Sequence, residues 1–196
     1  YQERRQRLKE LMPEKSLAIV AAAAEVIRNR DAEYPFRQSS DFWYLTGFTE
    51  PDAVLVIGPG QPDRLFVRPK HPEQEVRTGR RMGPDHVKHR LGIDQGYPLE
   101  ALDTELKTLL AEIAWVEYPF GCQKSTAIVD QAIKAKGLRS RRSDLLSHRA
   151  DLSRHLSQAR LIKSRQEIDL MKEAGRISAQ GHIAGMQACE PGMTED

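Results

Sequence analysis

Short apolar runs separated by polar turns constrain the fold of this chain most strongly. The longest run covers residues 17–24 and a shorter one covers 53–58, while the predicted strand at 64–68 has three apolar residues between two arginines. Runs of this length are typical of buried β-strands and fall far short of the roughly 20 apolar residues that a membrane-spanning helix needs. The segment 58–63 contains two glycines and two prolines, so the two strands around it are predicted to form a hairpin.

Helical spacing dominates most of the remaining chain. Residues 2–12 place Leu8, Leu11 and Met12 on one face of a helix, and residues 98–113 repeat apolar side chains at amphipathic intervals. Strands that alternate with helices in this way predict a layered α/β domain. The other predicted elements are a loop at 29–40, a strand at 114–118 and a helix at 125–136.

A capping box marks the start of a long helix near the end of the chain. The Ser164 hydroxyl is expected to accept a hydrogen bond from a free backbone N–H, while the Glu167 carboxylate returns to the cap residue. Apolar residues then recur along one side of the helix as far as Cys189. A long amphipathic helix needs a surface on which to bury its apolar side.

Two units are therefore predicted, at residues 1–159 and 160–196. The segment 139–160 is rich in arginine and serine, lacks a clear period, and is predicted as a linker or a final helix. Thr194 has the character of an N-cap at the start of one more helix. We therefore expect the chain to be the front part of a longer gene product.

The residues alone define no complete active site. The six histidines are scattered without a His-Glu-x-x-His pair or a His/Cys cluster, and no Gly-x-Ser-x-Gly nucleophile motif is present. Cys122 and Cys189 are far apart, which indicates a reducing compartment. The net charge of +2, and arginine clusters without interleaved aromatic residues, argue against nucleic-acid binding. A cytoplasmic chain with neither nucleic-acid nor membrane partners is expected.

One long stretch, residues 33–56, combines an unusual set of aromatic, charged and glycine residues. Together with the segments 79–83, 160–168 and 190–195, it closely resembles the N-terminal domain of Xaa-Pro aminopeptidases, which are proline-specific metallopeptidases of the creatinase/prolidase superfamily. The residues that carry this signature are Tyr34, Arg37, Asp41, Phe42, Trp43, Tyr44, Gly47 and Phe48.

The resemblance implies both a fold and a function. The implied fold is a mixed sheet flanked by helices, similar to ribonuclease-H-like and creatinase N-terminal domains, followed by the first helix of a pita-bread catalytic domain. The full-length enzyme is implied to remove the residue that precedes proline from peptides, using two manganese ions whose ligands all lie beyond Asp196. By itself the chain is implied to be inactive, to mediate homo-oligomer formation and to control substrate access.

The resemblance also implies candidate substrate contacts, because in related oligomers this domain lends residues to the pocket of a neighbouring subunit. Arg139 and Arg141 are candidates for the pocket rim, since a guanidinium group can hold a peptide carboxylate through two parallel hydrogen bonds. Arg77, which stands where some relatives have tryptophan, is a third candidate. The signature is interpreted as mainly structural, with packing expected for Phe42 and Trp43 and loop contacts for Arg37 and Asp41.

Two alternative functions remain open from the sequence. A prolidase, which cleaves Xaa-Pro dipeptides, belongs to the same superfamily and differs in its substrate. A peptidase-dead binding module of the same fold, as in the large subunit of a histone chaperone, would bind a partner without any chemistry. Because one fold can carry several functions, the fold alone does not separate these alternatives.

Overall fold

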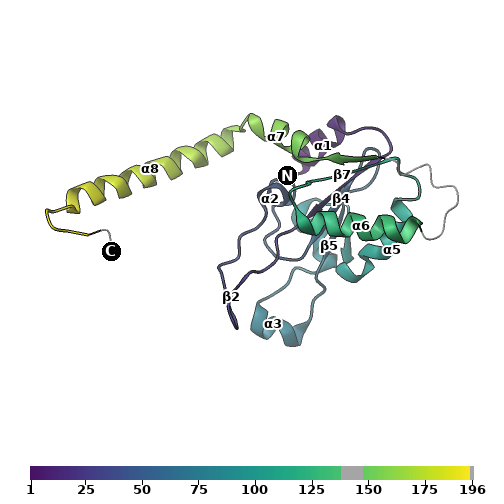
Figure 1. Ribbon diagram of the computed structural model, residues 1–196, viewed down its shortest axis with the longest axis horizontal. Coiled ribbons are helices and arrows are strands. Elements are labelled where there is room, and N and C mark those ends of the chain that lie inside the picture. The colour runs from purple at the N-terminus through teal and green to yellow at the C-terminus, as the bar shows by residue number, and fades with distance from the viewer. Residues whose placement is uncertain (138–147, 195–196) are drawn as a thin grey trace. The chain divides into compact units, whose positions relative to one another are not determined.

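The computed structural model describes residues 1–137 and 148–194, which divide into two compact units, Tyr1–Ala159 and Arg160–Asp196. The first unit is built on a sheet that has six strands in the described part of the chain, in the order β6-β5-β4-β1-β7-β8 (Figure 1). These strands are β1 (Ser16–Ala21), β4 (Val54–Ile57), β5 (Arg64–Val67), β6 (Gln95–Pro98), β7 (Trp115–Tyr118) and β8 (His148–Asp151).

Strand β1 joins an antiparallel part of the sheet to a parallel part. It runs antiparallel to β4, with Ala18 opposite Ile57, and parallel to β7, with Leu17 opposite Val116. Strands β4 and β5 form the predicted antiparallel hairpin, while β6 and β8 add in parallel at the two edges. The sheet is therefore mixed, as the family resemblance implies.

Helices cover both faces of the sheet, which explains why the strands are continuous apolar runs. Along β1, Ala18 and Val20 face one hydrophobic core, whereas Leu17 and Ile19 face the other. Strands buried on both faces lose the alternation of polar and apolar residues. The first core contains residues of α1 (Gln2–Leu11), α2 (Ser40–Thr46) and α7 (Ser153–Leu161), and the second contains residues of α5 (Leu102–Leu109) and α6 (Gln123–Gly137).

Smaller elements surround the sheet. The strands β2 (Ile27–Asn29) and β3 (Ala32–Glu33) form a separate hairpin, and the hairpin and helix α3 (Pro72–Thr78) both extend beyond the sheet in Figure 1. Two short 3₁₀ turns, η1 (Pro84–His86) and η2 (Leu99–Ala101), precede α4 (Val87–Leu91) and α5.

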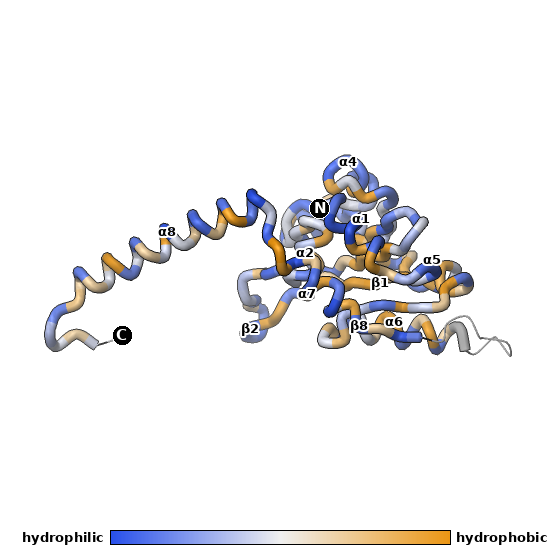
Figure 2. Tube along the Cα trace, turned by 90° about the horizontal axis from the view of Figure 1, so that it is seen from above, coloured by the Kyte–Doolittle hydropathy of each residue, from blue (hydrophilic) through white to orange (hydrophobic). Residues whose placement is uncertain are grey.

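The second unit contains the predicted capped helix, α8 (Arg165–Ala188). Ser164 Oγ accepts the Glu167 backbone N–H at 3.3 Å, and Glu167 Oε2 accepts the Ser164 N–H at 2.7 Å. Hydrophobic residues recur along α8 (Figure 2), and Met171 and Ile177 are 61% and 57% exposed. The continuation of the helix predicted to start at Thr194 lies outside the described residues.

Most predicted elements are confirmed, but both edge strands were missed and one segment was misassigned. The hairpin β2–β3 begins at Ile27 and lies partly in the segment predicted as a loop. Strands β6 and β8, together with α7, lie in segments predicted as helical or irregular. Edge strands need not be apolar because one of their sides is open, so their sequences carry no buried-strand signal.

Helix α1 differs from its predicted apolar face at two positions. Leu8 and Met12 are buried as expected, but Leu11 is 39% exposed, and the buried polar side chain is Arg5. The Arg5 guanidinium donates to Asp63 Oδ2 at 2.7 Å, to the Leu45 carbonyl at 2.9 Å and to the Gly92 carbonyl at 2.6 Å. This one side chain thus connects α1 to α2, to the β4–β5 turn and to the segment after α4.

Replacing Arg5 should strongly destabilise the fold. Arg5→Leu removes the buried guanidinium from Asp63, leaving Lys9 as that carboxylate's ion-pair partner, and it leaves two buried carbonyl groups without this donor. We expect a loss of about 3–5 kcal/mol in the free energy of unfolding. The matched control is Arg7→Leu at an exposed position of the same helix, for which a change within about 0.5 kcal/mol is expected. Urea unfolding of the 196-residue chain measures both; equal stability of the two variants would contradict this role.

Candidate functional site

The signature stretch leaves the β2–β3 hairpin, passes through α2 and enters β4. Within α2, Phe42 and Tyr44 are buried, and the Phe42 ring meets Phe48 edge to face with centroids 6.4 Å apart. Trp43 lies at the surface and is 40% exposed. Its ring meets the Tyr1 ring edge to face, with the two centroids 6.2 Å apart. The expected packing therefore holds for Phe42, whereas Trp43 lies at the surface.

Gln38, which the sequence analysis did not single out, fixes the loop before α2. Its Oε1 accepts the backbone N–H groups of Ala23 and Ser39 at 2.8 and 2.9 Å. Its Nε2 donates to the carbonyls of Phe48 and Glu50 at 3.2 and 2.9 Å. All four bonds are made to backbone, so this amide joins the segment just after β1 to the residues that flank both ends of α2. No periodicity in the sequence could reveal such a role.

Gly47 ends α2 in a way that a larger residue could not. It adopts the left-handed conformation (φ 67°), and its N–H donates to the Trp43 carbonyl at 2.9 Å. A Cβ atom here would lie 2.5 Å from the Tyr1 ring. The backbone angle favours glycine at this signature position, whereas the Tyr1 ring belongs to a half-exposed side chain that can move aside.

Two segments that carry the family resemblance meet at Glu50. Its Oε1 accepts the backbone N–H of Met82 at 2.6 Å, which joins the 33–56 stretch to the 79–83 segment. The neighbouring Arg81 donates to the Pro69 carbonyl and to Gln74 Oε1, at 3.3 and 2.9 Å. These contacts anchor the loop that follows α3.

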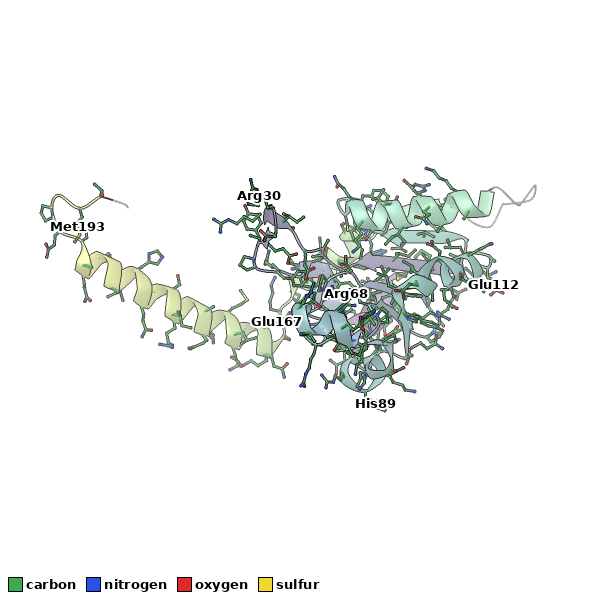
Figure 3. The ribbon with its side chains drawn as sticks, turned by 90° about the horizontal axis from the view of Figure 1, so that it is seen from below. Arg30, Arg68, His89, Glu112, Glu167 and Met193 are labelled. Carbon is green, nitrogen blue, oxygen red and sulfur yellow. The ribbon has the colours of Figure 1, made fainter. Side chains whose placement is uncertain are left out.

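The predicted site residues do not form one cluster in the described structure. Arg77 is exposed on α3, Arg37 is exposed before α2, and Asp41 is half-buried at the start of α2. Tyr34 is 53% exposed beside the β2–β3 hairpin, with the Arg28 guanidinium 5.8 Å from its ring centroid. Arg30 lies in the turn of that hairpin (Figure 3). Arg139 and Arg141 lie outside the described residues.

The described part of the chain offers little for metal or thiol chemistry. No group of three or more His, Cys, Asp or Glu side chains there is arranged to hold a metal ion. Cys122 is half-buried and Cys189 is exposed, and both are free thiols. Among the helices of the described ranges, none combines the length and the hydrophobicity needed to cross a membrane.

The fold agrees with comparisons to known proteins. The family model described as aminopeptidase P, N-terminal domain, matches residues 1–115. The chain belongs to this family.

Its relatives include peptidases with solved structures. Xaa-Pro aminopeptidase of Escherichia coli is 36% identical over the whole chain, which spans 46% of that relative, and Xaa-Pro aminopeptidase of Haemophilus influenzae is 35% identical, with 44% of its length covered. The structure titled Zn-substituted E. coli aminopeptidase P in complex with product superposes with a TM-score of 0.91 at 37% identity, covering 99% of this chain and 46% of that one. The chain thus spans about half the length of the relatives it matches.

The amide of Gln38 gives a direct test of the structural role of the signature. Gln38→Glu removes both donors and places a carboxylate beside two carbonyl oxygens, so we expect a loss of about 2–4 kcal/mol in unfolding free energy at pH 7. Part of the loss should be recovered at low pH, where a protonated carboxyl can again donate. The neighbouring Arg37→Ala serves as the exposed control, and chemical denaturation at pH 7 and 4.5 provides the measurement. A Gln38→Glu variant as stable as this control would show that the four bonds are dispensable.

Proposed function

We propose that this chain forms the N-terminal, non-catalytic part of a metal-dependent Xaa-Pro aminopeptidase that removes the N-terminal residue preceding proline. The observation that carries the proposal is the match over 99% of this chain to an aminopeptidase P structure, at 37% identity and a TM-score of 0.91. The contacts of Gln38, Gly47 and Glu50 are compatible with it, because they give the stretch that carries the family resemblance a folding role. Residues 1–159 form the N-terminal domain, and residues 160–196 begin the pita-bread peptidase domain.

In this proposal the catalytic metal pair, two manganese ions, belongs to the peptidase domain beyond this chain. The described residues do not fit such a site, because they contain no suitable cluster of ligands. No step of peptide hydrolysis is therefore assigned to them. Support for a metal-dependent enzyme comes from the similar structure whose title describes a Zn-substituted E. coli aminopeptidase P. The enzyme is proposed to act in the cytoplasm on proline-containing peptides.

The proposed tasks of the N-terminal domain are homo-oligomer formation and control of substrate access. Arg77, Arg139 and Arg141 are proposed to reach the rim of a neighbouring subunit's pocket. A guanidinium group suits this task, because it can hold a peptide carboxylate in a planar, two-bonded arrangement. The exposure of Arg77 on α3 is compatible with such a contact.

Peptide cleavage by the full-length gene product tests the assignment. We expect it to release alanine from Ala-Pro-Ala but not from Ala-Ala-Ala, to lose activity with a chelator and to regain it with manganese, whereas the pure 196-residue chain stays inactive. Cleavage of the Ala-Pro dipeptide alone would favour a prolidase instead. No cleavage of any proline peptide would favour the binding module, and metal-stimulated turnover by the 196-residue chain would overturn its non-catalytic role.

The proposed rim contacts are tested by comparing substrates with and without a free C-terminal carboxylate. Alanine substitution of Arg77, Arg139 or Arg141 in the full-length protein should raise KM about 10- to 100-fold for a substrate with a free C-terminus, as expected for a lost charged hydrogen bond. The same substrate with an amidated C-terminus should show a smaller change. The control is Arg90→Ala, at an exposed position of α4. Equal effects on both substrates would exclude a carboxylate contact.

A further inference from the structure

Glu117 of β7 is a buried carboxylate on the face of the sheet against which α7 packs. It lies opposite Ala18 of β1 and Ala150 of β8, and Ala18 belongs to the core shared by α1, α2 and α7. Residues that are paired across neighbouring strands face the same side, so Glu117 also points toward these helices. Its side chain is only 1% exposed. A charged residue in this position requires a partner.

The partner is His155, on helix α7. Its Nδ1 lies 3.0 Å from Glu117 Oε2, and its side chain is 30% exposed. The second carboxylate oxygen, Oε1, is buried and has no hydrogen-bond partner in the described part of the chain. The pair therefore joins α7 to the central sheet through one contact and leaves half of the carboxylate unsatisfied.

Other charged groups on the packed elements have partners of their own. From β8, Arg149 pairs with Asp130 of α6, on the opposite face of the sheet. From α7, Arg154 acts on Asp151. From α1, Arg5 and Lys9 pair with Asp63. The positive charge that acts on Glu117 is that of His155.

The charge of the buried pair depends on a single proton. While the pair holds one proton, its net charge is zero whichever residue carries that proton. Loss of the proton leaves an uncompensated negative charge in the core, with one oxygen unsatisfied. Burial raises the pKa of the Glu117 carboxyl, although the neighbouring His155 acts to lower it. Because the folded-state pKa is raised, the stabilisation is present at low pH and is lost as the pH rises through that pKa.

Two other polar contacts also attach α7. Tyr44 Oη donates to the Ala159 carbonyl at 3.0 Å, and Asp151 Oδ1 accepts the Ser153 N–H at 3.0 Å. Burial acts to raise the pKa of Asp151, but hydrogen bonds from Ser153 and from the Phe120 N–H outweigh it and lower that pKa. The carboxylate of Asp151 therefore stays ionised at neutral pH, and the contact it makes at the start of α7 persists.

We propose that the Glu117–His155 pair is a proton-dependent attachment that holds α7 on the sheet while it keeps one proton and loosens α7 when that proton is lost. The attachment lies just before Arg160, where the second compact unit begins. Release of α7 would therefore change how firmly the first unit is connected to the segment that follows. This inference is independent of the proposed peptidase function.

Hydrogen exchange of the 196-residue chain between pH 5 and pH 9 tests the proposal. After correction for the intrinsic exchange rate, the protection of the α7 amides at residues 156–159 should fall as the pH rises. The expected size is about tenfold for each unit by which the pair's folded-state pKa exceeds its unfolded value.

Two variants separate the pair from general effects of pH. Glu117→Gln keeps the shape but removes the charge, so α7 protection should become independent of pH and exceed the wild-type value at pH 9. His155→Gln leaves the carboxyl as the sole proton site, so the loosening should shift to lower pH. His89→Gln, at an exposed histidine of α4 (Figure 3), is the matched control and should keep the wild-type profile.

The proposal is overturned by a wild-type profile that is flat between pH 5 and pH 9, or by a Glu117→Gln variant with the wild-type slope. If the Glu117→Gln variant does not fold, the pH dependence of α7 protection in the His155→Gln variant provides the test. An unchanged midpoint in that variant would show that the two residues do not share the titrating proton.

Discussion

The buried ion pair between Arg5 and Asp63 joins several elements on one side of the sheet. Helix α1 is short and highly charged, and little of its surface is apolar enough to hold it in place. The guanidinium group supplies what hydrophobic burial does not, because its planar array of donors satisfies a carboxylate and two backbone carbonyls at once. The ends of α2 and α4 and the β4–β5 turn meet at this single side chain. The helix at the centre of the family signature, α2, is therefore joined to α1 through a buried polar side chain.

The sequence predicted those parts of the fold in which physical requirements leave a local pattern. Strands β1, β4, β5 and β7 are buried on both faces or nearly so, and this burial produces the short apolar runs. Helix α5 shows amphipathic spacing, and α8 shows its capping box at Ser164. The edge strands β6 and β8 leave no such pattern, because solvent on their open side tolerates residues such as Gln95 and Arg149. Arg5 was also missed, since a charged residue in a charged helix gives no sign of burial.

The candidate site was predicted less well, for a different reason. The stretch around α2 stood out by resemblance, but its folding role rests on Gln38 and Glu50, whose side chains bind backbone groups distant in sequence. Contacts of this kind depend on tertiary structure and have no spacing rule. Within the signature, Gly47 is the residue whose role could be argued locally, because a helix that ends in the left-handed conformation favours glycine. The Glu117–His155 pair lies 38 residues apart in sequence and is equally invisible without the fold.

The central position of β1 has a consequence for how the chain reaches its structure. The pairing of β4 with β5 closes through a short turn, so it can form as soon as both strands are available. The pairing of β1 with β7, in contrast, joins Ser16 to Trp115. The entropy of closing so long a loop must be overcome before this contact contributes any stability. During synthesis, one side of β1 therefore stays open until β7 has left the ribosome, which makes the middle of the finished sheet one of the last places to be completed.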